Sequence, residues 1–144
     1  MLIRIALAAV LVAVGVSAVV AQQDPIAARK ALMKLNGQHG AALSKILKGE
    51  EPFDAAKVEA GFAQWADTAA KFSALFPDSS KTGETRAAAA IWTDRAGFDA
   101  AVAKFAKDVA DNRAKAATLD GLKAAMPIIG KNCSDCHQAF RNPS

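Results

Sequence analysis

The sequence has no tyrosine, only two histidines and only two cysteines. No Ser-His-Asp arrangement and no pair of carboxylates suited to acid–base chemistry stands out, so we do not expect an enzyme. Lysines and arginines form no block and do not alternate with aromatic residues, which argues against a nucleic-acid partner. Beyond the first 21 residues, no apolar run is long enough to cross a membrane.

The first 21 residues form a separate segment. Arg4 precedes an apolar run that ends in small residues at Ala21, which is the pattern of a secretory signal peptide. A retained membrane anchor is the alternative, because the run is about long enough to span a bilayer. The ending V-x-A before QQDP favours cleavage. We therefore predict a mature chain of residues 22–144, exported to the periplasm, with no membrane segment.

The remaining chain is rich in alanine, and its apolar residues recur at the spacing of amphipathic helices. The first predicted helix spans residues 25–47, with Asp24 as N-cap, Pro25 at the first position and Gly49 after the end. The apolar stripe of this helix, with His39 between its members, consists of Leu32, Leu35, Leu43 and Ile46.

Three further helices follow from the same spacing. One begins near Asp54 and carries Val58, Phe62, Trp65, Ala69, Phe72 and Phe76. The next carries Phe98, Val102, Phe105 and Val109. The last is capped by Thr118 and carries Leu119, Leu122, Met126, Ile129, Cys133, Cys136 and Phe140. Four amphipathic helices with short or moderate links predict an all-α fold, an antiparallel four-helix bundle.

Three segments fit this pattern less well. Residues 77–86, PDSSKTGETR, are too polar to hold a packed core. Residues 85–92 favour helix without belonging clearly to either neighbouring helix. Pro127 lies within the last helix, where it removes a hydrogen bond and should kink the helix ahead of the cysteines.

Cys133, Cys136 and His137 form the C-x-x-C-H pattern that attaches c-type haem. Two thiols three positions apart on a helical turn can each bond to one vinyl group at the haem edge. The following residue then directs its imidazole toward the iron. The pattern therefore predicts one covalent haem c, with His137 as an iron ligand.

Other readings of the two cysteines remain open. In an oxidising compartment they could form a disulfide, which would leave a haem-free exported helical protein. A thioredoxin-like redox pair would be expected beside a strand–helix unit, and no strand is predicted. A zinc ion needs four ligands, and only His39 could join the three residues of the motif. The order of the motif favours covalent haem over all three.

Function depends on the group opposite His137, because His/Met ligation suits electron transfer whereas an open position can bind gases. Met126 precedes His137 by about 16 Å on the same helix, so it cannot reach the far face of the haem. Met33, on the first helix, is the thioether able to approach, either as a ligand or as packing against the ring. His39 is the other candidate, about 120° around the helix from Met33.

A bound haem would also need an apolar pocket inside the bundle. Aromatic side chains at core spacing that could supply it are Phe62, Trp65, Phe72, Phe105 and Phe140. For each of them, ordinary core packing is the alternative.

The arrangement of a signal peptide, four helices and a C-terminal C-x-x-C-H motif resembles the class II cytochromes c. That family contains the high-spin cytochromes c′ and the low-spin cytochromes of the c-556 type. The segments RKALMKLNG, LKGEEPFD and IWTDRAGF resemble family landmarks, and LFPDSSKTG is closer to the low-spin branch. The resemblance covers the whole predicted mature chain.

The resemblance implies roles for three further residues. The arginine at the position of Arg29 tends to lie near a haem propionate in this family. The residue at the position of Met33 faces the distal side of the iron, and the arginine at the position of Arg141 lies on the proximal side. Without the resemblance, both arginines would be interpreted as solvated surface charges.

These observations predict a periplasmic electron carrier with a low-spin iron bound by His137 and Met33, acting with unidentified redox partner proteins. The alternative is a five-coordinate, high-spin cytochrome c′ that binds nitric oxide or carbon monoxide. Proteins of this family often form dimers through their first two helices. The alanines at 55, 56, 60 and 63 would permit close approach, so a homodimer stays open.

Overall fold

The computed structural model describes residues 24–143. The predicted signal peptide, residues 1–21, lies outside them. Four long helices make up most of the described chain: α1 (Pro25–Leu47), α2 (Ala55–Phe72), α4 (Arg95–Arg113) and α5 (Leu119–Phe140). A one-turn helix, α3 (Ala90–Thr93), precedes α4, and the 3-10 turns are η1 (Ser73–Leu75), η2 (Asp78–Ser80) and η3 (Lys115–Ala117). No described helix is both long and apolar enough to cross a membrane.

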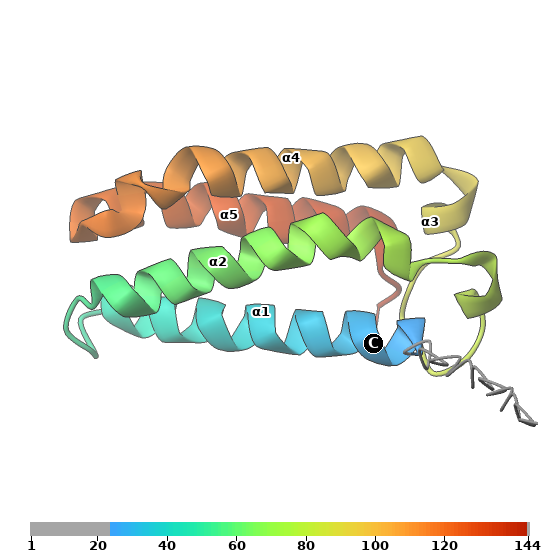
Figure 1. Cartoon of the computed structure of the whole chain (residues 1–144), viewed down its shortest axis with the longest axis horizontal. Coiled ribbons are helices and arrows are strands. Elements are labelled where there is room, and N and C mark those ends of the chain that lie inside the picture. Colours follow the sequence, from blue (N-terminus) through green and yellow to red (C-terminus); the bar gives the residue numbers. More distant parts are fainter. Residues whose placement is uncertain (1–23, 144) are drawn as a thin grey trace, which may run out of the picture.

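Successive long helices run in opposite directions, so the beginning of α1 and the end of α5 lie at the same end of the molecule (Figure 1). This is the predicted all-α antiparallel four-helix bundle. Helix α1 packs mainly on α2, α2 also on α4, and α4 on α5, whereas α1 and α5 touch each other little. The order of packing therefore leaves one side of the bundle, between α1 and α5, loosely closed.

Side-chain caps begin the long helices where the sequence predicts them. The Asp24 carboxylate accepts a hydrogen bond from the Ile26 backbone N–H at 2.9 Å, and Pro25 follows at the first helical position. Asp54 and Thr118 cap α2 and α5 in the same way. Gly49 has a φ of 74°, a conformation that costs glycine little, and it lies just past the end of α1. The predicted bounds of the first helix are confirmed.

The end of the second helix differs from the prediction. Helix α2 stops at Phe72, η1 adds one tighter turn, and Phe76 lies outside the helix with φ −124° and ψ 55°. Its side chain is nevertheless 4% exposed, because the ring packs edge-on against Trp92 and Phe98. The apolar spacing predicted the burial of Phe76 correctly and its helical conformation wrongly.

The buried residues form two clusters at opposite ends of the bundle. The larger one, near the α1–α2 connection, comprises Leu43, Ile46, Val58, Phe62, Trp65, Val109, Ala116, Leu122, Ala125 and Ile129. The smaller one, near α3, comprises Phe76, Ile91, Phe98 and Val102. The prediction that Leu35 faces the core is wrong: its side chain is 41% exposed on α1. Heptad-like spacing alone does not distinguish the edge of an apolar stripe from its centre.

The segments that fitted the sequence pattern poorly have defined structures. Within 77–86, Ser80 is 2% exposed, so this polar stretch is anchored to the protein by hydrogen bonds. From 85–92, only the last residues enter a helix, α3, and Ala87 forms an isolated antiparallel bridge with Arg141. Helix α5 continues through Pro127 to Phe140, and the kink stays a prediction.

Candidate functional site

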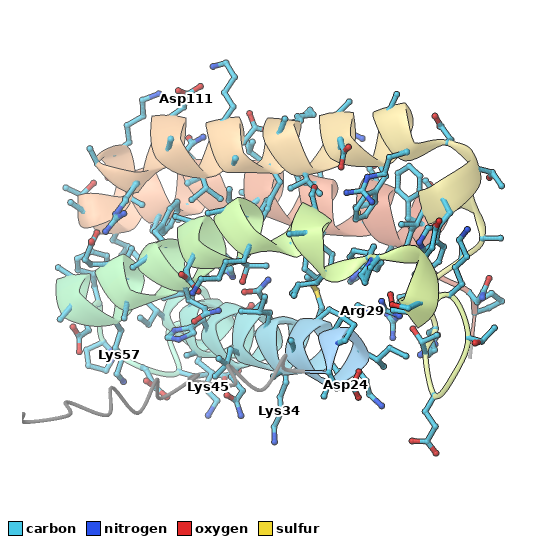
Figure 2. The ribbon with its side chains drawn as sticks, turned by 45° about the vertical axis from the view of Figure 1, so that its right-hand side comes forward. Asp24, Arg29, Lys34, Lys45, Lys57 and Asp111 are labelled. Carbon is cyan, nitrogen blue, oxygen red and sulfur yellow. The ribbon has the colours of Figure 1, made fainter. Side chains whose placement is uncertain are left out.

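A cavity of about 960 Å³ lies inside the bundle and is lined by all four long helices. Its size is within the range of cofactor sites in proteins, roughly 300–1,000 Å³. Apolar side chains form most of the wall, while the charged residues Lys30, Lys34, Glu84 and Arg86 also contribute to it. Lys34 directs its ammonium group away from the bundle (Figure 2). The cavity therefore combines an apolar interior with charged groups on its wall.

The last two turns of α5 bring the three residues of the motif to this cavity. Cys133, Cys136 and His137 all line it, and both thiols are free. Within residues 24–143, no cluster of three or more His, Cys, Asp or Glu side chains is placed to hold a metal ion directly. This arrangement does not suit a zinc site, but it suits two thiols that bond to a ring edge and an imidazole that binds its metal.

The protein environment changes the acidity of all three side chains. Burial raises the pKa of the Cys133 thiol above its ordinary value, and burial together with Cys133 raises the pKa of Cys136. Burial, with the positive charges of Arg141 and Arg86 nearby, lowers the pKa of His137. A lowered pKa favours the neutral imidazole, which is the form that can bind iron.

Met33 lines the cavity from α1, so it comes from the wall that the last turns of α5 do not form. Met126 also lines the cavity, but it belongs to α5, as His137 does. His39 does not line the cavity. Its side chain lies against Gly61 of α2, with Nδ1 3.8 Å from where a Cβ on that glycine would be. The structure thus places the two thioethers at the cavity and His39 elsewhere.

Arg29 is 4% exposed and is not the solvated surface charge that the sequence alone indicates. It lies one turn before Met33, contributes to the cavity wall and stacks on the ring of Phe76, with its guanidinium carbon 4.5 Å from the ring centroid. Its guanidinium also donates hydrogen bonds to Leu75, Ser80 and Thr85. Burial lowers the pKa of Arg29, partly offset by Asp24.

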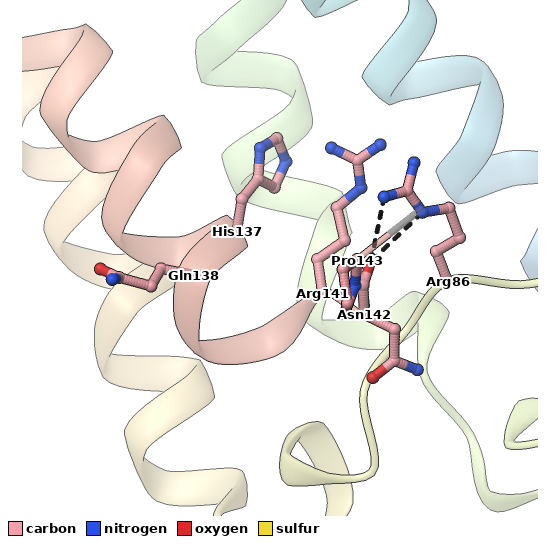
Figure 3. A pocket seen from close by; sticks show the side chains of 6 residues that line it. All are labelled: Arg86, His137, Gln138, Arg141, Asn142 and Pro143. Atoms are coloured by element: carbon pink, nitrogen blue, oxygen red, sulfur yellow. Dashed lines mark hydrogen bonds between the residues drawn. The ribbon is translucent and has the colours of Figure 1, made fainter.

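A smaller recess of about 350 Å³ adjoins His137 at the surface. Figure 3 shows Arg141 and Arg86 beside His137, with Arg86 hydrogen-bonded to the backbone carbonyl of Asn142. Because Arg141 and His137 line both the recess and the main cavity, Arg141 lies on the side of the imidazole. The sequence did not single out Arg86.

The wall of the cavity fits a large, flat, apolar group. Of the five aromatic residues predicted for a pocket, Trp65, Phe72, Phe105 and Phe140 line it, whereas Phe62 is buried in the larger core cluster. Three glycines that the sequence analysis did not single out also line it: Gly37, Gly40 and Gly130. A Cβ added at any of them would meet no atom of another part of the protein within 4 Å. Small residues on two facing helices leave room for a ring to approach the backbone.

Comparison with known proteins gives consistent matches over nearly the whole described chain. A family model described as Cytochrome C′ matches residues 24–141. The cytochrome c-556 of Rhodopseudomonas palustris is 44% identical to this chain over 131 residues, which are 88% of each. The cytochrome c′ of the same organism is 42% identical over 142 residues, covering 98% of this chain and 97% of the relative.

Solved structures of similar proteins superpose well. The cytochrome c′ of Rhodopseudomonas palustris has a TM-score of 0.80 at 39% identity, covering 85% of this chain and 99% of that one. Its oxidised cytochrome c556 has a TM-score of 0.78 at 41% identity, with the same coverage. A mutant cytochrome c′ of Alcaligenes xylosoxidans, solved as a nitric oxide complex, has a TM-score of 0.73 at 28% identity, covering 83% and 94%.

Proposed function

Because the chain belongs to the cytochrome c′ family, we propose that it is an electron carrier whose iron is bound by His137 and Met33. Haem c with its iron is the cofactor of this family and of this chain. The bound haem supplies one-electron exchange between ferrous and ferric iron. We propose electron transfer as its role, and no enzymatic reaction.

The observation that carries the proposal is the position of the two candidate ligands. Met33 lines the cavity from α1 and His137 lines it from α5, two helices that pack little against each other. A ring bonded to Cys133 and Cys136 would lie beside His137, with Met33 on the other helix. The apolar side chains around the cavity would exclude water and favour ferrous over ferric haem, because the ferrous iron and its ring carry less net charge.

Arg29 and Arg141 have different parts in this proposal. Arg29 is buried at the cavity wall with its terminal nitrogens hydrogen-bonded, so its positive charge would act on a haem propionate from a fixed position. Arg141 lies on the side of His137 and is exposed. Its charge there stabilises the neutral imidazole over the protonated one, in keeping with the lowered pKa of His137.

Spectroscopy of the purified holoprotein tests the ligand assignment. We expect the ferric protein to give a low-spin electron paramagnetic resonance signal and a thioether-to-iron charge-transfer band, and the ferrous protein not to bind carbon monoxide. Met33→Leu should convert the iron to high spin and open it to carbon monoxide. Met126→Leu is the matched control, because it removes the other thioether at the cavity and should leave the spectrum low-spin.

The second candidate function is gas binding at a five-coordinate iron. It is favoured by the solved nitric oxide complex of a relative with the same fold. In that case Met33 would crowd the distal face without binding iron. A high-spin wild-type spectrum that changes readily with carbon monoxide, and that Met33→Leu leaves high-spin, would support gas binding and exclude the first function.

The proposed function also includes a periplasmic location and pairing of two copies. We place the protein in the periplasm with redox partner proteins, on the basis of the predicted signal peptide. Proteins of the cytochrome c′ family are often dimeric. The outer faces of α1 and α2 expose Leu35 and the alanines at 55, 56 and 60, which would suit pairing of two copies. Sedimentation of the wild type and of Leu35→Glu tests this part, since a charge there should dissociate such a dimer.

A further inference from the structure

Direct packing contributes little to the separation of α1 from α5 across the cavity. Helix α1 rests mainly on α2, and α5 rests mainly on α4 and η3. Yet Met33 and His137 lie on these two helices, and a bond from each to one iron would require a fixed distance between them. Another part of the chain must therefore connect the two helices at this end of the bundle.

The connection begins at Arg29, one turn before Met33. One terminal nitrogen of its guanidinium, Nη2, donates to the hydroxyl oxygen of Thr85 at 2.7 Å and to the carbonyl of Ser80 at 3.1 Å. The other, Nη1, donates to the Ser80 hydroxyl at 2.9 Å and to the carbonyl of Leu75 at 3.1 Å. Four hydrogen bonds from a buried charged group hold the segment after α2 firmly against α1.

The connection continues from Thr85 to the end of α5. The Thr85 hydroxyl oxygen accepts a second hydrogen bond, from the backbone N–H of Ala87 at 3.1 Å. Residues 86–88 then run antiparallel to residues 140–142: the Ala88 N–H donates to the Phe140 carbonyl at 3.0 Å, and the Asn142 N–H donates to the Arg86 carbonyl at 2.8 Å.

The side chain of Arg86 closes the same pairing. Its Nε and Nη2 donate to the carbonyl of Asn142 at 3.2 and 3.0 Å (Figure 3). The neighbouring Arg141 N–H donates to the carbonyl of His137 at 3.1 Å. A continuous series of hydrogen bonds therefore runs from the turn that precedes Met33 to the turn that carries His137. We call residues 80–88 the strap.

We propose that the strap sets the distance between α1 and α5 and so holds Met33 toward the haem face opposite His137, with Thr85 as the positioning residue. This inference rests on the proposed ligation by Met33. Thr85 connects the two halves of the strap because its hydroxyl oxygen accepts one hydrogen bond from Arg29 and another from the Ala87 N–H. Removing that oxygen leaves the Ala87 N–H without this acceptor and takes one of four hydrogen bonds from Arg29, which interrupts the series at Thr85.

The test substitutes Thr85→Val in the holoprotein, which keeps the side-chain shape and changes no charge. We expect the ratio of high-spin to low-spin ferric iron, and the rate of carbon monoxide binding to the ferrous protein, to rise about tenfold, equivalent to about 1.4 kcal/mol. Backbone amides of Ala88 and Asn142 should exchange hydrogen faster as well. Thr85→Ser retains the hydroxyl and should restore the wild-type values. Thr82→Val, at an exposed position of the same loop, should have no effect.

Each outcome supports or overturns the inference. All spectra are recorded well below the unfolding temperature. If Thr85→Val lowers the Tm but leaves the spin state and the carbon monoxide rate unchanged, Thr85 only stabilises the fold and the inference fails. If Thr85→Val does not fold, Arg86→Lys replaces it, because lysine keeps the positive charge near His137 and cannot make both hydrogen bonds of Arg86 to the Asn142 carbonyl. An unchanged spin state and an unchanged carbon monoxide rate in that variant overturn the inference.

The two proposals can fail separately. A high-spin wild type rejects ligation by Met33. The carbon monoxide rate of Thr85→Val still reports whether the strap keeps Met33 near the open face: a roughly tenfold faster rate supports the strap, whereas an unchanged rate rejects it. A low-spin wild type with an unaffected Thr85→Val protein rejects the strap alone.

Discussion

The two ends of the bundle are held together by different interactions. At the end near the α1–α2 connection, ten buried apolar side chains pack against one another. At the other end, the helices surround a cavity, and buried polar groups such as Arg29, Ser80 and Asn132 connect them through hydrogen bonds. Apolar packing tolerates no gap, whereas hydrogen-bonded connections can span one. From this comparison we expect the first end to stabilise the fold and the second to hold the haem.

The largest effect is expected at the packed end. Phe62 is 0% exposed in the centre of the larger cluster, and its ring packs edge-on against Trp65. Phe62→Ala should lower the free energy of unfolding by about 3–5 kcal/mol, because it removes apolar contacts and leaves a cavity. Urea denaturation of the holoprotein, followed by circular dichroism, measures this change.

The control for that substitution lies on the surface of α5. Ile128→Ala removes another large apolar side chain, but one that is 41% exposed, and it should change the stability by less than about 0.5 kcal/mol. Similar decreases in the free energy of unfolding for both variants would contradict the view that apolar packing at this end stabilises the fold. An unchanged spin state in Phe62→Ala would sharpen the contrast with the cavity end.

A smaller effect is expected where α4 meets α5 beside the cavity. Asn132 is 6% exposed and donates hydrogen bonds to Asp108 at 2.7 Å and to the Ile128 carbonyl at 2.9 Å, while its oxygen accepts from Lys104 at 3.1 Å. Asn132→Ala should cost about 1–3 kcal/mol, since it leaves buried polar groups without partners. It should also perturb the haem absorption spectrum, because Asn132 lines the cavity beside Cys133.

Asn112→Ala provides a comparison for Asn132, because it removes another buried asparagine, one whose hydrogen bond stays within α4. Asn112 is 8% exposed and donates to the Asp108 carbonyl at 2.8 Å, but it does not line the cavity. It should therefore lower the stability without altering the spectrum. If the haem spectrum changes equally in both variants, the effect of Asn132 does not come from its position at the cavity wall.

The smallest effect is a pH dependence at Asp108. Hydrogen bonds from Lys104 and Asn132, with Lys107 nearby, hold the pKa of the Asp108 carboxyl below its ordinary value of 3.8. A carboxyl with a lowered pKa in the folded state stabilises the protein above its unfolded pKa and loses that contribution as the pH falls through the folded pKa. The Tm difference between the wild type and Asp108→Asn should be fully present at neutral pH, begin to shrink near pH 3.8 and vanish only below the lowered pKa of the folded state.

Glu50→Gln controls for the loss of one negative charge. Glu50 is exposed in the connection after α1, away from the α4–α5 contact. Its Tm difference from the wild type should not follow that of Asp108→Asn through the acidic range. A parallel pH profile would attribute the effect at Asp108 to net charge instead of to its hydrogen bonds.

The sequence by itself determined the features that depend on neighbours along the chain. Asp24, Pro25 and Gly49 specified both ends of α1, because capping groups act within one turn. The spacing of apolar residues specified four helices and hence a bundle, and the order Cys133, Cys136, His137 predicted the haem c that the family carries.

The tertiary structure decided what depends on residues far apart in the chain. It buried Arg29 by bringing Ser80 and Thr85 to it, exposed Leu35, and placed Met33 and not His39 at the cavity. None of these outcomes follows from helical periodicity, because periodicity states which residues share a face but not what that face meets. Partners contributed by a distant loop become visible only when the chain is folded.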